Sequence, residues 1–242
     1  DCAFTDNTAS EAGGALSTLG AVAELDNCRL TGNTLGQAWG HGSAIYMGSN
    51  VSRSRLALRS STVTGNDGQS VVHQRVHPGF PGLPGELSVE SSILWANTNG
   101  SSPVAYALGS DWIGVLPSAR YSDIQGTAAT YSGTAVISAD PAIVSDLYLD
   151  PNMSPCVDSG DPQTAAAGRL RAKTTSTTGA ADSGTIDMGF HHLGANNPRY
   201  FGIGNPDTQL GTRSWIDHSG TPTSGAPLSL GLRGAQPSTL AV

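Results

Sequence analysis

The chain has 242 residues, of which 31 are glycine and 14 are proline, while charged residues make up 13 % and aromatic residues 6 %. The formal net charge of −7 argues against a nucleic-acid partner, because phosphate binding requires clustered cations. No apolar stretch of about 18 residues is present, so we expect no membrane span. No long stretch follows the helical period either, which predicts a fold almost without helices.

A short segment that ends in asparagine recurs four times in the N-terminal half of the chain. The segments 2–7, 28–33, 61–66 and 92–97 align without gaps, and their last residues are Asn7, Asn33, Asn66 and Asn97. The intervals between these asparagines are 26, 33 and 31 residues (33−7, 66−33 and 97−66). A repeat of this length predicts a solenoid, in which each unit stacks on the next.

Two further apolar runs accompany these segments. Upstream, apolar and polar residues alternate at 23–25, 56–58 and 87–89, as in half-buried strands. Downstream, a second apolar cluster follows at 13–16, 42–46, 71–72 and 104–106. The unit is too short for a propeller blade and lacks the helix of leucine-rich or ankyrin repeats. We therefore predict an all-β fold, a right-handed parallel β-helix whose coils bury their inward apolar residues against one another.

The repeated asparagine predicts a structural ladder. Asparagine tolerates the left-handed backbone of a sharp turn, and its amide can bond to the equivalent amide one coil away. We expect Asn7, Asn33, Asn66 and Asn97 to form such a ladder in the interior or along a turn, and we favour this over a polar binding stripe.

The cysteines leave two alternatives open. Cys2 and Cys28 occupy the same place in successive repeats, whereas Cys156 lies far along the chain. Adjacent parallel strands are about 4.8 Å apart, which falls inside the Cα window for a disulfide. Parallel side-chain vectors make that bond awkward, so a Cys2–Cys28 disulfide and a buried pair of free thiols remain equal alternatives.

The motifs along the chain resemble a known group of proteins. The Gly-Gly-Ala-Leu motif at 13–16 and the Thr-Gly-Asn coil ends resemble those of bacterial right-handed β-helix repeat proteins. That group includes the chlamydial polymorphic outer-membrane proteins and secreted proteins with a choice-of-anchor domain. The motifs at 121–126, 139–144, 148–149, 154–162 and 187–192 follow the order of that family's closing coils. The resemblance covers residues 1–193 and implies the C-terminal part of a longer protein that is secreted or displayed on the cell surface.

The remaining residues, 194–242, are rich in glycine, proline, threonine and serine. They resemble the beginning of the small C-terminal β-sandwich of similar secreted proteins. We therefore expect two parts, the coils and closing motif over 1–193 and a tail or partial β-sandwich over 194–242.

Histidines occur in the insertions that lengthen the second and third intervals. Both insertions follow the Asn turn, so we expect them to lie close together on one side of the coils. Aromatic rings with arginine or histidine suit a sugar ring, and two or three histidines suit Zn²⁺ or Cu²⁺. A proline-rich loop with histidine as filler is the simpler interpretation, and we favour it. The candidate ligand-binding residues are Trp39, His41, His73, Arg75, His77 and Phe80.

The aspartates gather between residues 140 and 187. Several precede Pro or Ser-Gly, which is typical of Asx turns, and none recurs at equivalent positions of successive coils. Asp158 and Asp161 form a candidate Ca²⁺ site, because carboxylates and turn carbonyls are the ligands that this ion prefers. No nucleophile elbow or Ser-His-Asp order is present. We expect no catalytic residue, and a structural role for His191 and His192.

These features favour a non-catalytic extracellular module for adhesion, assembly or polysaccharide contact. Its expected partner is a polysaccharide or a cell-surface glycan. The fold alone does not decide function, because pectate lyases, pectin esterases and polygalacturonases share the pectin-lyase-like architecture. A polysaccharide lyase or glycoside hydrolase is therefore the first alternative. A subunit of an extracellular filament or sheath is the second, since exposed coil ends invite self-association.

Overall fold

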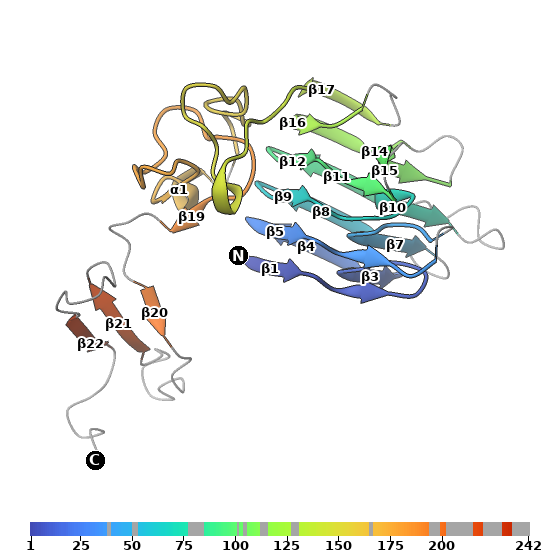
Figure 1. Cartoon of the computed structure of the whole chain (residues 1–242), viewed down its shortest axis with the longest axis horizontal. Coiled ribbons are helices and arrows are strands. Elements are labelled where there is room, and N and C mark those ends of the chain that lie inside the picture. The colour runs from blue at the N-terminus through green and yellow to red at the C-terminus, as the bar shows by residue number, and fades with distance from the viewer. Residues whose placement is uncertain are drawn as a thin grey trace, which may run out of the picture. The chain divides into compact units, whose positions relative to one another are not determined.

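The computed structural model describes residues 1–37, 40–49, 53–76, 85–100, 102–103, 106–111, 116–126, 131–164, 167–193, 199–201, 215–219 and 229–233. The protein is nearly all β, with 48 % strand and 4 % helix. Parallel coils stack into a solenoid of about three turns (Figure 1), which confirms the predicted fold class. The expected scarcity of helix is confirmed as well.

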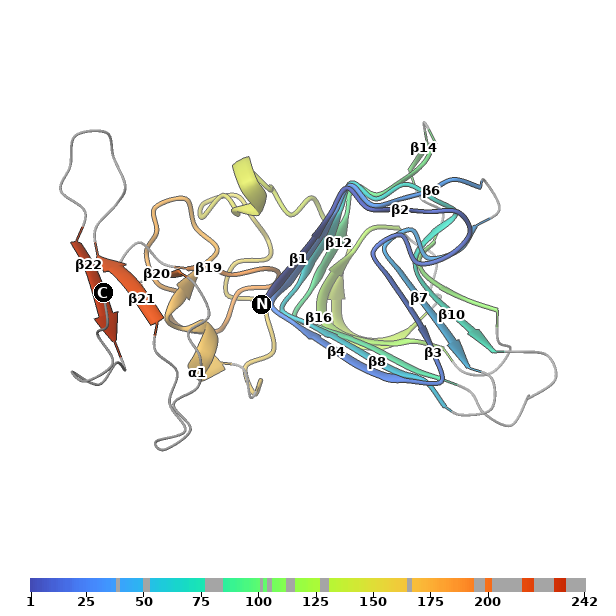
Figure 2. The same cartoon turned by 90° about the horizontal axis from the view of Figure 1, so that it is seen from below.

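The coils have three faces, which are seen end-on in Figure 2. The first face contains β1 (Cys2–Thr5), β5 (Cys28–Thr31), β9 (Thr62–Thr64) and β12 (Ile93–Trp95). The second contains β4 (Val22–Asp26), β8 (Arg55–Arg59) and β11 (Glu86–Glu90). The third contains β3 (Leu16–Leu19), β7 (Ile45–Ser49), β10 (Ser70–Val76) and β15 (Tyr106–Ser110). The strands within each face pair in parallel, as stacked coils require.

The first two faces join at the far end of the solenoid. There β16 (Ser118–Ile124) pairs with β11 through its first half and with β12 through its second half. Tyr121, in the middle of β16, has a φ of 47°, and this left-handed residue turns the corner between the faces. The strand β17 (Ser132–Ile137) then pairs with β16 along both halves.

Short strands mark the third corner of the coils. β2 (Thr8–Ala9) pairs in parallel with β6 (Thr34–Leu35), and single bridges continue this stack to Asp67 and Thr98. β13 (Thr98–Asn99) and β14 (Ser102–Pro103) form an antiparallel pair that projects from the corner, as Figure 2 shows.

The four repeated asparagines lie side by side at the corner that follows the first face. The side-chain oxygen of Asn33 accepts hydrogen bonds from the backbone and side-chain nitrogens of Asn7, at 3.1 and 2.9 Å. In the same way, the side-chain oxygen of Asn66 accepts two hydrogen bonds from Asn33, and that of Asn97 accepts two from Asn66. These four bonds are 2.8 to 3.0 Å long. The last three asparagines are fully buried. Buried amides of this kind are favourable only when their polar atoms are bonded, and here each rung bonds the next.

The left-handed backbone at this corner does not belong to the asparagines, contrary to the prediction. It belongs to the residue before each of them, because the turn must be made before the amide can point inward. The four φ values are 55°, 66°, 66° and 52°, at Asp6, Gly32, Gly65 and Ala96.

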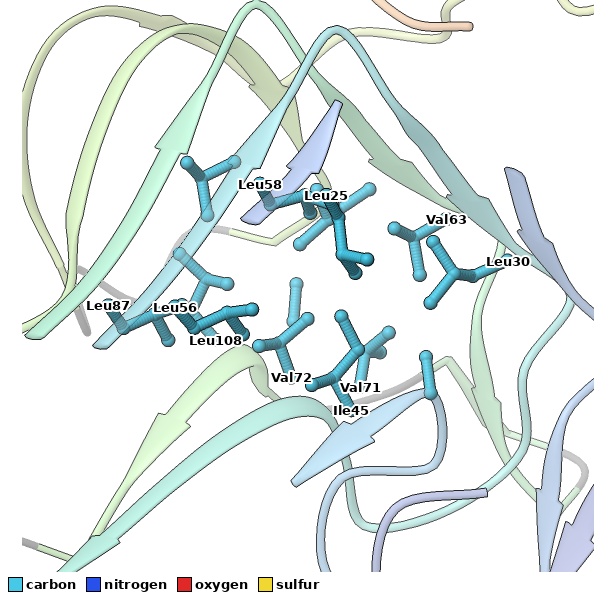
Figure 3. Packing of buried hydrophobic residues seen from close by; sticks show 14 of the residues in the cluster. Leu25, Leu30, Ile45, Leu56, Leu58, Val63, Val71, Val72, Leu87 and Leu108 are labelled. Atoms are coloured by element: carbon cyan, nitrogen blue, oxygen red, sulfur yellow. The ribbon is translucent and has the colours of Figure 1, made fainter. Parts of the chain in front are cut away.

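The interior of the solenoid is filled by aliphatic side chains from all three faces (Figure 3). Residues alternate between inside and outside along each strand, so equivalent positions of successive coils stack in rows. The row Leu16, Ile45, Val72 and Leu108 is one example from the third face. Burial of each such side chain contributes roughly 1.5–3 kcal/mol, which opposes the entropy lost on ordering the coils.

The segment 139–192 does not continue the stack of parallel coils. It contains η1 (Ser145–Leu147), α1 (Ala167–Leu170), β18 (Lys173–Thr174) and the start of β19 (His192–Leu193). It packs beside the first face, where Leu149, Cys156 and Met188 surround the outward side chain of Ile93. Its last part also reaches the beginning of the solenoid, since the Asn27 side chain bonds both the N–H and the carbonyl of His191. We call residues 139–192 the closing segment.

One glycine permits this close approach. Gly189 has a φ of 93°, and a Cβ atom at this position would lie 2.8 Å from both Ile93 Cδ1 and Thr62 Oγ1. Only glycine therefore allows the Asp-Met-Gly-Phe motif to lie directly on the first face.

The chain divides into two compact units, residues 1–192 and 193–242. In the second unit the described residues form an antiparallel three-stranded sheet, in which β21 (Trp215–Ser219) pairs with β20 (Arg199–Phe201) and β22 (Ser229–Arg233). Among the described residues, no helix has the length and apolar character needed to cross a bilayer.

Candidate functional site

His41 and His73 come together on the outside of the third face. His41 directly precedes the turn into β7, and its N–H donates to the Glu11 carbonyl of the preceding coil at 3.1 Å. His73 lies in β10, in register with Tyr46 of β7. The two imidazole rings stack with their centroids 4.2 Å apart. Two histidines from successive coils thus form one cluster, although His73 lies within the regular strand β10 and not, as the sequence had suggested, in an inserted loop.

The ring of His73 is held by small residues around it. Its Nδ1 lies 3.1 Å from the Ser70 hydroxyl oxygen, which also accepts a hydrogen bond from the Gly42 N–H at 3.1 Å. On the other side its register partner in β15 is Gly109, where a Cβ atom would approach Nδ1 to 2.6 Å. The imidazole therefore occupies a space that any other residue at 109 would fill.

Asp111 completes this cluster from the end of β15. Its Oδ1 lies 3.2 Å from His73 Nε2, and its Oδ2 lies 3.6 Å from Arg75 Nε. The side chain of His73 is 5 % exposed, whereas that of Asp111 is 38 % exposed and that of Arg75 is 50 % exposed. The cluster is therefore closed on its inner side and open to solvent on its outer side.

Burial dominates the electrostatics of this cluster. It lowers the pKa of His73, although the carboxylate of Asp111 acts in the opposite direction. Burial likewise raises the pKa of the Tyr46 hydroxyl, against the attraction of Arg75. Burial therefore favours the neutral form of His73, the form in which imidazole binds metal ions.

Three of the six residues predicted to form this pocket, His41, His73 and Arg75, are brought together. The other three, Trp39, His77 and Phe80, lie outside the described residues. Sequence analysis missed Asp111 and Tyr46. Tyr46 stands one residue after the aligned Ile45, so the register between coils could have identified it. Asp111 gave no signal, because it follows the fourth coil's apolar run with no histidine near it in the sequence.

A second hollowed region, which we call the groove, runs over the outside of the second face. Its floor is a row of small side chains, Ala57, Ser88, Ser118 and Ser132, at equivalent positions of successive coils, and Glu24 continues this row at the first coil. On one side lies the row Asp26, Arg59, Glu90 and Arg120, and on the other lie Arg55 and Glu86. Alternation along the strands produces this pattern, because the apolar residues between these rows point inward.

Three hollows follow one another along the groove. Their volumes are about 310, 380 and 640 Å³, and each pair of them shares lining residues, so the hollows adjoin one another. Ser88 and Ser118 line the first and second, and Glu90 and Arg120 line the first and third. The closing segment forms part of the third wall through Gln163, Thr164 and Arg169.

The cations that line the groove are paired with carboxylates. Arg120 lies 2.7 Å from Glu90 and 3.3 Å from Asp161, and Arg55 lies 2.8 Å from Glu86. The carboxylate of Glu90 is the largest cause of a raised pKa of Arg120. Arg59 and Arg169 both lie within 4 Å of Asp26, at 3.5 and 3.6 Å. The groove therefore offers both hydrogen-bond donors and acceptors, without an excess of free cations.

The two aspartates of the candidate Ca²⁺ site take part in different interactions. Asp161 faces Arg120, and its Oδ1 accepts the Gln163 N–H at 2.8 Å. Asp158 lies with Asp182 and Asp187, but the latter two already accept hydrogen bonds from neighbouring groups. A Ca²⁺ site at Asp158 and Asp161 thus stays a prediction, and the bonded carboxylates around them explain the local structure without an ion.

His191 and His192 make structural contacts within the closing segment. His191 is buried and bonds Asp182 at 2.8 Å and the Gly189 carbonyl at 2.9 Å, while His192 stacks on Tyr148. All three cysteines are free thiols, including the register partners Cys2 and Cys28.

The chain was compared with protein-family models, curated proteins and solved structures, and none of them matches it.

Proposed function

We propose that this chain is an extracellular β-helix module that binds a polysaccharide or cell-surface glycan along the groove, without a catalytic step. The observation that carries this proposal is the row of adjoining hollows on the second face, with its floor of mostly small side chains and its walls of paired arginines and carboxylates. An extended polar chain is the ligand whose shape fits a long, shallow and polar surface.

The spacing of the coils supports this ligand. Successive strands lie about 4.8 Å apart, so the groove places a polar side chain on its walls at intervals close to the length of one sugar ring. Successive rings would then meet an arginine and a carboxylate in turn, since the two alternate along the walls. Serines on the floor leave room for the ring, while Arg55, Glu86, Glu90 and Arg120 on the walls can bond its hydroxyl groups.

The charges favour a neutral glycan over a strongly acidic one. The groove's arginines are already paired, and the net charge of −7 would repel a polyanion. The binding of a neutral chain should depend weakly on salt, because it releases few counterions.

The proposal is tested by affinity electrophoresis of the full chain in gels that contain neutral or acidic polysaccharides. We expect retardation by at least one neutral polysaccharide, and loss of that retardation in Ser118→Phe, which fills the floor from an exposed position. The matched control is Ser17→Phe, an exposed serine that points outward on the third face. Equal binding by both variants would place the ligand elsewhere, and no retardation by any polysaccharide would refute the proposal.

The same samples decide between binding and catalysis. After long incubation with a polysaccharide that the chain binds, we expect neither new reducing ends nor unsaturated products. Their appearance in the wild type and not in Ser118→Phe would assign an enzyme to the groove instead.

A further inference from the structure

We propose that His41, His73 and Asp111 bind a divalent transition-metal ion of the Zn²⁺ class on the outside of the third face. One ring nitrogen of each histidine and one carboxylate oxygen of Asp111 all lie within 4.8 Å of one another. This site lies on a different face from the groove, so it does not depend on the proposed glycan binding.

Two unpartnered nitrogens carry this inference. Nδ1 of His41 and Nε2 of His73 are both buried, and neither has a hydrogen-bond partner. Asp111 Oδ1 approaches His73 Nε2 to 3.2 Å, yet the two atoms lack the alignment of a hydrogen bond. A buried polar nitrogen without a partner costs free energy, and a bound cation would remove that cost at both rings.

The ligand set selects the metal. Two imidazoles and one carboxylate suit Zn²⁺, Cu²⁺ or Ni²⁺, whereas Ca²⁺ and Mg²⁺ prefer oxygen ligands alone. Tetrahedral Zn²⁺ at about 2.0–2.1 Å from each ligand brings the ligand atoms to about 3.3 Å from one another. The ligand atoms lie within 4.8 Å of one another, so binding requires them to approach by up to about 1.5 Å. Because the two rings stack at an interplanar angle of 19°, the less buried His41 ring must also turn so that its lone pair points at the ion.

The surroundings of the three residues are those of a ligand set. The Ser70 hydroxyl accepts the Gly42 N–H and can also accept the Nδ1 proton of His73, which leaves the Nε2 lone pair free. Hydrogen bonds of this kind fix the tautomer and the orientation of metal-binding histidines. Arg75, 3.6 Å from the second oxygen of Asp111, orients the carboxylate in the same manner. Three protein ligands leave a coordination position open toward solvent.

The test is isothermal titration of the full chain, first freed of metal with a chelator, with ZnCl₂. We expect one ion per chain, with binding weakened at least tenfold in His41→Gln, His73→Gln and Asp111→Asn. The matched controls are His192→Gln and Asp146→Asn, which remove the same groups from the closing segment and should leave the affinity unchanged. Equal weakening in the controls, or unchanged affinity in the three site variants, would overturn the site.

A measurement on the wild type keeps the proposal testable if a variant fails to fold. X-ray absorption of the zinc-loaded chain should show nitrogen and oxygen ligands only, at about 2.0–2.1 Å. Sulfur at about 2.3 Å would place the ion at cysteine thiols, such as the exposed Cys2, and would overturn the proposal. Failure to bind Zn²⁺, Cu²⁺ or Ni²⁺ at one equivalent would overturn it as well.

Discussion

At the scale of single residues, the four asparagines of the ladder differ in the number of hydrogen bonds that their side chains make. Asn66 is an inner rung: its side-chain oxygen accepts two bonds from Asn33, and its side-chain nitrogen donates to Asn97 and to the Leu30 carbonyl. Replacement by alanine leaves these buried groups without partners. Because each such group costs about 1–3 kcal/mol, we expect Asn66→Ala to lower the free energy of unfolding by roughly 3–5 kcal/mol, measured by denaturant titration.

The outer rung provides the control. Asn7 is exposed, and its side chain donates a single hydrogen bond, to Asn33, so Asn7→Ala should cost about 1 kcal/mol or less. If both variants lose the same amount, the amide bonds are not what distinguishes the inner rungs, and the ladder contributes less than its geometry suggests.

A buried carboxyl group makes the stability depend on pH. Asp123 lies between the first face and the closing segment, where its oxygens accept the Ala139 N–H and the Cys156 thiol. Burial raises its pKa from 3.8 to about 6. The folded state therefore holds this proton more tightly than the unfolded state, and its stability falls as the pH rises from about 4 to about 6.

We expect this group to contribute a loss of roughly 2–3 kcal/mol across that window. Asp123→Asn imitates the protonated group, so the variant should be more stable than the wild type above pH 6, and the difference should vanish below about pH 4. Denaturant titrations of both proteins at several pH values measure this. Parallel pH profiles for the two proteins would show that Asp123 is not the group responsible.

At the scale of elements, the contact between the closing segment and the first face depends on Gly189. Alanine there would place a methyl group 2.8 Å from Ile93 Cδ1 and from Thr62 Oγ1, in addition to the strain of a positive φ. We expect Gly189→Ala to loosen the closing segment, with a loss of roughly 2–4 kcal/mol and faster hydrogen exchange between residues 139 and 192.

Gly126 separates the two effects. Its φ is 109°, but a Cβ atom at this position would meet nothing within 4 Å. Gly126→Ala therefore carries the backbone strain without the clash, and should destabilise the protein by no more than about 1–2 kcal/mol. If Gly126→Ala lowers the free energy of unfolding as much as Gly189→Ala does, backbone strain alone explains both losses and the close contact of Gly189 contributes nothing.

At the scale of the whole molecule, the first coil presents the edges of all three faces. Among the described strands, β1, β3 and β4 each pair with another strand on one side only, and Leu19 and Val22 on this coil are 63 % and 70 % exposed. Unpaired strand edges with exposed apolar side chains invite association with another chain. We expect concentration-dependent self-association in sedimentation velocity, which Leu19→Lys combined with Val22→Lys should reduce.

The control is Met153→Lys, which places a lysine on an equally exposed apolar residue of the closing segment, away from the first coil. It should leave the self-association unchanged. A wild-type chain that remains monomeric at every concentration would contradict the expected association through the coil end.

Much of the solenoid could be predicted because a coil's inward residues repeat. Similar residues, Ser61, Val63 and Asn66, stand at the positions that match Cys28, Leu30 and Asn33 one coil earlier. The strands pair in the register that this alignment gives. Periodicity therefore indicated the strands, the stacking and the positions of the asparagines. It could not indicate which residue at the corner is left-handed, because asparagine and the residue before it are both compatible with that backbone.

The sequence by itself determined the parallel solenoid and the repeated asparagine, because both follow from matching one coil to the next. Only the tertiary structure decided that Asp111 joins the two histidines, that small residues align into a groove, and that the closing segment packs beside the coils. The physical reason is that these contacts join segments with no shared pattern, and they form through packing and hydrogen bonds specific to this chain, such as those between Asn27 and His191.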